Sequence, residues 1–221
     1  MIKINVSPQI YDACPELVIS AIECGVDNSL HNNELWKEIE HFCAEFKSAN
    51  KIEDINQRAA IKATRDAYKK LGKDPNRYRP SAEALCRRTL KDMPLYQINT
   101  LVDLINLVSL KTGYSIGGFD AEKINGNLQL GVGTADEQFE AIGRGFLNID
   151  GLPVYRDNTG GIGTPTSDEE RTKISLETKR ILMIINGYSG RKGLQEATEY
   201  SIELLKKYAN GADFSIQEIK R

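Results

Sequence analysis

Residues 180–185, which read Arg-Ile-Leu-Met-Ile-Ile, constrain the fold more than any other stretch of the chain. Five consecutive apolar residues leave no polar face, so a strand at this place must be covered on both sides. The run is much too short to cross a bilayer, because a membrane helix needs about 20 apolar residues. We therefore expect a strand buried inside a globular protein that has no contact with a membrane.

The patterns around this strand predict an α+β protein, with helices in the N-terminal and central parts and a mixed sheet in the second half. We expect strands at 3–6 and 16–26, helices at 32–46, 52–71, 81–90 and 100–113, short strands between 115 and 186, a helix at 194–211 and an edge strand at 213–219. Without a linker or a repeat, the 221 residues predict a single domain, 1–221.

Local signals predict where these elements begin and turn. The side chains of Asn33, Ser81 and the Thr100–Asp103 pair suit helix starts, and glycines 72, 113 and 211 suit helix ends. The Asn-Gly pair at 125–126 and the Asp-Gly pair at 150–151 favour tight hairpin turns. Alternation of polar and apolar residues at 173–176 indicates one more strand.

The remaining composition excludes several classes of protein. The four cysteines are scattered without a C-x-x-C pair, and His31 and His41 have no ligands at zinc-site spacing. We expect no metal and no cofactor. No apolar stretch of a signal peptide opens the sequence, so a cytoplasmic protein is expected. No serine-histidine triad motif occurs either.

Positive charge is concentrated in one segment, although the whole chain has a net charge of -2. Residues 62–91 contain ten basic and three acidic residues, which gives this segment a net charge of +7. Its central part reads "DPNRYRPSAEALCRR". In one interpretation the basic side chains bind RNA phosphates and the tyrosine stacks on an unpaired base; these candidates are Arg77, Tyr78, Arg79, Arg87, Arg88 and Lys91. In the other, the segment is a stiff turn whose arginines pair with nearby carboxylates.

The loop "TGGIGTPTSDEERT" at 159–172 is the second candidate site. Glycines allow a ligand to approach the backbone, and the hydroxyls of Thr164, Thr166 and Ser167 are able to position carbonyl or phosphate oxygens. The lysine and the glycine spacing of a phosphate-binding Walker loop are absent. An irregular solvent-exposed connection is the alternative.

The segment "INTLVDLINLVSLKTGYSIGGFD", residues 98–120, resembles the B3/B4 editing domain of the bacterial phenylalanyl-tRNA synthetase beta subunit. Asp103, Asn106, Val108, Gly113, Phe119 and Asp120 fall in register with that family's pattern. A looser similarity continues through "GGIGTPTSDEERTKISLETKRILMII", and the whole chain is similar to proteins that carry this module alone. The resemblance implies a layered β/β/α module.

The same resemblance implies which residues line a ligand pocket. Asn106 and the glycine pair Gly160 and Gly161 match pocket positions. The family's editing histidine falls on Gly117, its threonine on Ile105 and its glutamate on Ile184, so the polar groups that read the substrate are missing. We therefore expect a pocket that is larger, more apolar and specific for a different substrate.

Two functions follow from this comparison. The first is a freestanding tRNA-binding module, with aminoacyl-tRNA hydrolysis in trans as its candidate activity and tRNA and an amino-acid-like ligand or aminoacyl ester as partners. The second is a noncatalytic protein that binds an amino-acid-like metabolite. The sequence leaves open which of these applies and whether the basic segment lies beside the pocket.

Overall fold

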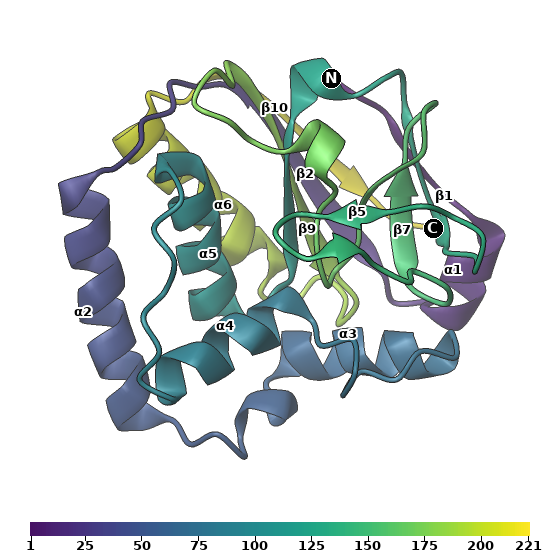
Figure 1. Ribbon diagram of the computed structural model, residues 1–221, viewed down its shortest axis with the longest axis horizontal. Helices are drawn as coiled ribbons and strands as arrows, with labels where there is room; N and C mark the ends of the chain where they lie inside the picture. Colours follow the sequence, from purple (N-terminus) through teal and green to yellow (C-terminus); the bar gives the residue numbers. More distant parts are fainter.

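The computed structural model describes all residues from 1 to 221 (Figure 1). The six helices are α1 (Pro8–Ala13), α2 (Asn33–Ala49), α3 (Ala59–Lys70), α4 (Ser81–Leu90), α5 (Thr100–Thr112) and α6 (Leu194–Ala209). The strands are β1 (Ile4–Val6), β2 (Val18–Gly25), β3 (Ile116–Asp120), β4 (Leu128–Val132), β5 (Glu140–Ala141), β6 (Gly145–Phe146), β7 (Pro153–Arg156), β8 (Gly161–Gly163), β9 (Arg180–Gly187) and β10 (Ala212–Ile219). Three short 3₁₀ turns complete the structure.

Strand β9 lies inside a four-stranded antiparallel sheet of order β10-β2-β9-β3. Its side chains alternate between two hydrophobic cores, as the period of two along a strand requires. Ile181, Met183 and Ile185 enter the larger core, and Leu182 and Ile184 enter the second one. The prediction of a strand buried on both faces is therefore confirmed.

A second four-stranded sheet, of order β1-β4-β7-β8, packs against one face of the first. Between the two sheets lies the second core, which includes Leu130, Tyr155 and Phe119. On the other face, α5 and α6 cover the first sheet through residues such as Leu104 and Leu204, and α2 packs against α5 on the outside (Figure 1). The chain is thus a layered β/β/α structure, and the predicted α+β class is confirmed.

Helices α3 and α4 lie at the end of these layers, below the sheets in Figure 1. The predicted helix at 52–71 is shorter than expected, because Arg58 has an extended ψ of 129° that separates a 3₁₀ turn from α3. Ala82 and Cys86 of α4 are fully buried in a small cluster with Leu110 of α5. No helix has both the length and the apolar character that a membrane span requires.

Several local expectations were wrong for reasons of tertiary structure. Residues 173–176 form no strand, and residues 8–13, for which no helix was predicted, form the helix α1. Neither the Asn125-Gly126 turn nor the Asp150-Gly151 turn closes a hairpin, because β4 pairs with β1 and β7. The sheet was predicted mainly in the second half of the chain, but β1 and β2 from the N-terminal part and β10 from the C-terminus also belong to the two four-stranded sheets.

Helix starts also differ from the expected ones by one residue or more. Asn32, one residue before the expected Asn33, accepts hydrogen bonds from the backbone N–H groups of the first turn of α2. Asn99 caps α5, so Asp103 is free to accept a hydrogen bond from the indole of Trp36 at 2.7 Å. Ser81 does not cap α4. Gly113 ends α5 with a φ of 83°, as predicted.

Replacing Ile184 in the middle of β9 tests the central position of this strand. Ile184→Ala removes a fully buried side chain between the sheets, and we expect it to lower the free energy of unfolding by about 2 to 5 kcal/mol. Ile216→Ala on the edge strand β10 is the control, because Ile216 is 54% exposed, and should cost less than about 1 kcal/mol. Urea unfolding of both variants measures the difference, and equal losses would contradict this arrangement.

Candidate functional site

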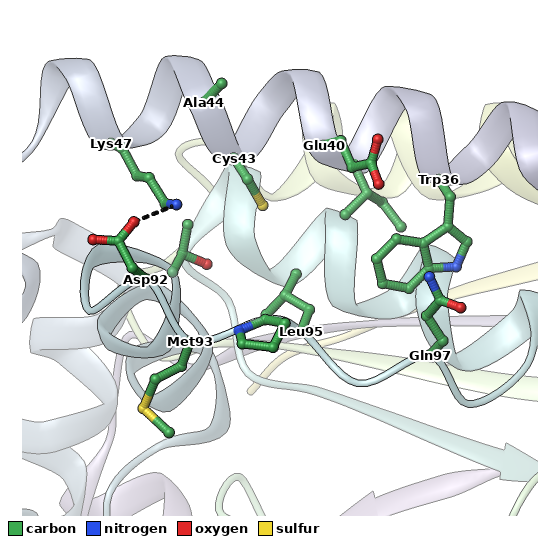
Figure 2. Close-up of a pocket in the computed structure, with 12 residues that line it drawn as sticks. Trp36, Glu40, Cys43, Ala44, Lys47, Asp92, Met93, Leu95 and Gln97 are labelled. Carbon is green, nitrogen blue, oxygen red and sulfur yellow. Dashed lines mark hydrogen bonds and ion pairs between the residues drawn. The ribbon is translucent and has the colours of Figure 1, made fainter.

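A groove of about 640 Å³ lies between α2 and residues 89–97 (Figure 2). Trp36, Cys43 and Leu95 point into it, and an ion pair of 2.7 Å between Lys47 and Asp92 closes one end. The Trp36 indole N–H is already bonded to Asp103. The groove therefore has a largely apolar lining and no converging set of free polar groups.

A smaller pocket, of about 430 Å³, has the composition of a polar ligand site. Helix α5 forms one wall with Val102, Ile105, Asn106 and Ser109, whose spacing of three and four residues places them on one helix face. The other walls come from α4, from the free edge of β3, from the β5–β6 turn and from the loop after β8. Apolar walls with a few polar groups are typical of small-molecule sites.

The loop after β8 owes its shape to its own threonines. The Thr164 hydroxyl donates to the Ser167 carbonyl at 3.0 Å and accepts the N–H groups of Thr166 and Ser167. The Thr166 hydroxyl is bonded to the buried hydroxyl of Tyr68 on α3 at 2.8 Å. All three predicted residues line the pocket, but the two threonine hydroxyls are used to hold the loop.

Asp168 follows this loop and lies between the edges of the two sheets. Its Oδ2 accepts a hydrogen bond of 3.1 Å from the N–H of Gly118, on the side of β3 that has no neighbouring strand. Its backbone forms a bridge with Gly163 at the edge of β8. Burial raises the pKa of the Asp168 carboxyl to about 7, against an ordinary value of about 3.9.

Two other polar side chains line the same pocket. The side-chain amide of Asn106 has no hydrogen-bond partner in the protein and is available to a ligand. Lys173 pairs with Glu170 at the surface. The pocket thus has one amide, on Asn106, and one carboxyl, on Asp168, that retain free hydrogen-bonding capacity.

The structure does not bring the three predicted glycines into the pocket wall. Gly117 faces the core between the sheets, where an added Cβ would lie 2.7 Å from the Phe119 ring. Gly161 lies against Phe139 and Val154, and Gly160 precedes β8 with open space around it. It is the neighbouring Gly118 that faces the cavity.

The basic segment lies beside the pocket, because Ser81 and Leu85 of α4 are part of its wall. The Ser81 N–H also donates to the Pro165 carbonyl at 2.8 Å, which joins the segment to the loop. Three arginines converge on the buried Glu83, whose side chain is 1% exposed. Their nitrogen-to-oxygen distances are 2.8 Å for Arg65, 3.5 Å for Arg79 and 2.8 Å for Arg87.

The other basic candidates have different surroundings. Arg77 is exposed without a carboxylate partner, and its guanidinium lies 5.6 Å from the ring of Tyr78. Lys73 covers that ring at 3.8 Å, so Tyr78 has at most one face free for a base. Arg88 donates to the Pro94 carbonyl and stacks on Tyr96, and Lys91 is exposed after α4.

Comparison with known proteins decides the family. The sequence model of the B3/4 domain matches residues 63–218, which is more than half of the chain. The chain belongs to the B3/4 domain family. All residues that line the pocket described above lie inside the matched range.

Two relatives connect this B3/4 domain with phenylalanyl-tRNA synthetase. The phenylalanine–tRNA ligase beta subunit of Bartonella henselae is 32% identical over 100 residues, which cover 44% of this chain and 12% of that protein. An N-terminal fragment of the beta subunit from Pyrococcus horikoshii has a similar fold, with a TM-score of 0.50 at 13% identity, over 99% of this chain and 54% of that one. The B3/4 domain thus spans only part of each relative.

The pairing of β3 with β9 shows where Asp168 lies relative to Gly117 and Ile184, the positions that the resemblance assigns to the family's histidine and glutamate. Gly117 and Ile184 lie directly opposite each other on β3 and β9, and both face the core between the sheets. A Cβ at Gly117 would lie 3.6 Å from Oδ1 of Asp168. In this B3/4 domain the carboxylate of Asp168, which follows the loop after β8, therefore lies next to Gly117, which has no side chain.

The sequence analysis did not single out Asp168, which is followed by two further acidic residues, Glu169 and Glu170. Those two glutamates do face surface partners, Arg171 and Lys173. The only local signal that separates Asp168 is its place directly after the Thr-Pro-Thr-Ser turn, which turns the chain back toward the edge of β8.

Removing the charge of Glu83 tests whether it organises the arginines of the B3/4 domain. Glu83→Gln leaves Arg65 and Arg87 without a buried counter-charge, and we expect a loss of about 2 to 4 kcal/mol in the free energy of unfolding. Glu34→Gln, in an exposed pair with Lys37, is the matched control and should change stability by less than about 0.5 kcal/mol. A loss no larger than the control's would show that the cluster is loosely held.

The raised pKa of Asp168 predicts how stability depends on pH. Because the folded protein binds this proton more tightly than the unfolded chain, the contribution of Asp168 to stability falls as pH rises from about 4 to about 7. Asp168→Asn keeps an acceptor for the Gly118 N–H and should raise stability at pH 8 by about 1 to 3 kcal/mol, with little gain near pH 4. Urea unfolding at both pH values measures this, and a destabilised variant at pH 8 would contradict it.

Proposed function

We propose that this B3/4 domain binds the aminoacylated end of a tRNA in the pocket between α4, α5 and β3, and hydrolyses the ester there. One observation carries the proposal: α4 contributes Ser81 and Leu85 to the pocket wall and also bears Arg87 and Arg88, and the turn directly before α4 bears Arg77 and Arg79. A substrate in the pocket would thus have its phosphates beside these cations. The relatives support the same direction, since they are named as parts of a ligase that charges tRNA.

Charge at the basic segment supports an anionic partner. Three guanidinium groups surround the single carboxylate of Glu83, so this cluster has an excess of two positive charges. The Arg79 side chain is 44% exposed despite its contact with Glu83, and Arg77 has no acidic partner. Guanidinium groups held in this way are suited to phosphate oxygens, because their planar N–H donors match the geometry of the anion.

The pocket walls suit an amino acid that is joined to a ribose. Leu85, Val102 and Ile174 provide apolar surface for a side chain, and the Asn106 amide is free to donate to a carbonyl oxygen. A volume of about 430 Å³ is within the range of pockets that hold small ligands. The absence of a side chain at Gly117 and the aliphatic Ile184 favour a substrate other than the one that the related synthetase domain edits.

A noncatalytic protein that binds a free amino-acid-like metabolite is the second candidate. The observation that favours it is the pairing of Arg79 and Arg87 with Glu83, which gives both arginines a structural role without RNA. A protein of this kind would use the same pocket and would leave the basic segment as ordinary surface.

The dependence of tRNA binding on salt separates these candidates. We expect the affinity for tRNA to fall steeply with salt, and the double variant Arg77→Ala and Arg79→Ala to reduce the log–log slope by about 1 to 2, because each lost phosphate contact removes almost one unit. The matched control is Arg191→Ala with Arg221→Ala, two exposed arginines that pair with Glu218 and Asp12 outside the pocket. If the two double variants had the same salt slope of tRNA binding, the assignment of Arg77 and Arg79 as phosphate contacts would be contradicted.

Hydrolysis is tested separately with a panel of tRNAs that carry different amino acids. We expect the protein to accelerate ester loss for at least one member over the spontaneous rate. Acceleration for none of them, combined with tight binding of a free amino acid, would support the noncatalytic candidate.

A further inference from the structure

We infer that Asp168 is the general base of this pocket and activates the water that attacks the aminoacyl ester. This inference rests on the proposed function and names the group that performs its chemical step. The position that the resemblance assigns to the family's editing histidine is Gly117 here, so no side chain at that place is able to take up a proton. Asp168 comes from a different element, the loop after β8, and lies next to that position.

Hydrogen bonding leaves one oxygen of Asp168 free to act. Oδ2 is fixed by the Gly118 N–H at 3.1 Å, which orients the carboxyl against the edge of β3. Oδ1 accepts no hydrogen bond from the protein, and no lysine or arginine pairs with the carboxyl. A carboxylate that served only to cap the strand edge would need one oxygen. The second one, Oδ1, lies beside Gly117 and Gly163 at the border of the cavity that Asp168 lines, and it is not fully enclosed by the protein.

Glycines keep the space around this carboxyl clear. A Cβ on Gly163 would lie 2.9 Å from Oδ1 of Asp168, and one on Gly117 would lie 3.6 Å from the same atom. On the pocket side, a Cβ on Gly118 would lie 2.5 Å from Ile105. Added Cβ atoms at Gly117 and Gly163 would first meet the Phe119 ring, at 2.7 and 2.5 Å, so these two glycines make room for that ring. A side chain at Gly163 would also crowd the Asp168 carboxyl, and one at Gly118 would fill part of the cavity.

The charged groups around Asp168 allow it to work near neutral pH. Every side chain that α4, α5, β3 and the β5–β6 turn contribute to the pocket is uncharged, and Lys173, the only other charged side chain in the wall, pairs with Glu170. The next residue, Glu169, faces Arg171. Burial raises the pKa of Asp168 to about 7, which is where a general base is most effective in neutral solution.

No other side chain in the pocket is suited to this task. His31 precedes α2 and His41 lies on it. Both histidines are exposed, and neither lines the pocket. Thr164 and Thr166 use their hydroxyls in the loop. Asn106 donates or accepts hydrogen bonds but does not take up a proton at neutral pH.

The proposed step is an ester hydrolysis in which all atoms balance. The Asp168 carboxylate accepts a proton from water, and the water oxygen forms a bond to the ester carbonyl carbon. The tetrahedral intermediate then breaks its bond to the ribose oxygen, which takes the proton from Asp168. The products are the free amino acid and a tRNA with a free terminal hydroxyl, and the carboxylate is restored.

Single-turnover deacylation of the substrate found with the tRNA panel tests this role. We expect Asp168→Asn to lower the rate by about 10² to 10⁴-fold, because an amide does not accept the proton. Its affinity for the matching tRNA with a non-hydrolysable amide link should stay within about threefold of the unsubstituted protein's, since the amide fills the same space. Asp136→Asn removes an exposed carboxylate outside the pocket and should leave the rate unchanged.

The pH profile of the unsubstituted protein gives a second readout that needs no variant. After subtraction of spontaneous hydrolysis, the rate should rise with pH, reach half of its maximum near pH 7 and level off above it, and Asp168→Asn should lose this inflection. Thermal unfolding confirms that each variant is folded.

Three results would overturn the inference, and they are distinguishable. A fast Asp168→Asn variant with an unchanged pH profile would remove Asp168 from the chemistry but leave the proposed function in place. A variant that loses only affinity for the amide-linked tRNA and keeps its rate at saturation would assign Asp168 to substrate binding. Absence of hydrolysis by the unsubstituted protein on every member of the panel would remove the proposed function and this inference together.

Discussion

The structure depends on the burial of β9 on both of its faces. This strand supplies side chains to two cores, so it must be covered by helices on one side and by a second sheet on the other. Its partner β3 then becomes an edge strand, and α5 packs beside that edge. The pocket forms where these constraints meet, between the helix, the edge of β3 and the loop that returns from the second sheet.

An edge strand between two sheets has backbone groups that need partners in a place where little water reaches. Asp168 provides one such partner for the Gly118 N–H. The same contact puts a carboxyl into a partly buried cavity, which raises its pKa and costs stability at neutral pH. A neutral side chain would accept the same hydrogen bond from the strand edge without this loss of stability. The carboxyl at this position therefore favours a chemical role for Asp168 over a purely structural one.

Features that depend on local pattern were predictable from the sequence. The apolar run of β9, the amphipathic face of α5 and the glycine at its end are each set by neighbours within a few residues. The burial of Asp168 and the three arginines around Glu83 were not predictable in this way, since each brings together residues from separate elements. The internal pairs predicted by the second interpretation of the basic segment occur at Arg79 and Arg87, which both contact Glu83. Arg77 has no acidic partner, and phosphate binding by this segment stays a prediction.

The central claim is that the pocket beside α4 holds an aminoacyl ester within reach of Asp168. The most direct measurement is a crystal structure with an aminoacyl-adenosine whose ester is replaced by an amide. We expect its carbonyl carbon to lie near Oδ1 of Asp168 with one water between them, and its adenosine to extend toward α4, because a general base acts through hydrogen-bond contact or through a single water. An analogue bound in the groove between α2 and residues 89–97, or one whose ammonium group contacts Asp168 with the carbonyl pointing away, would contradict the account.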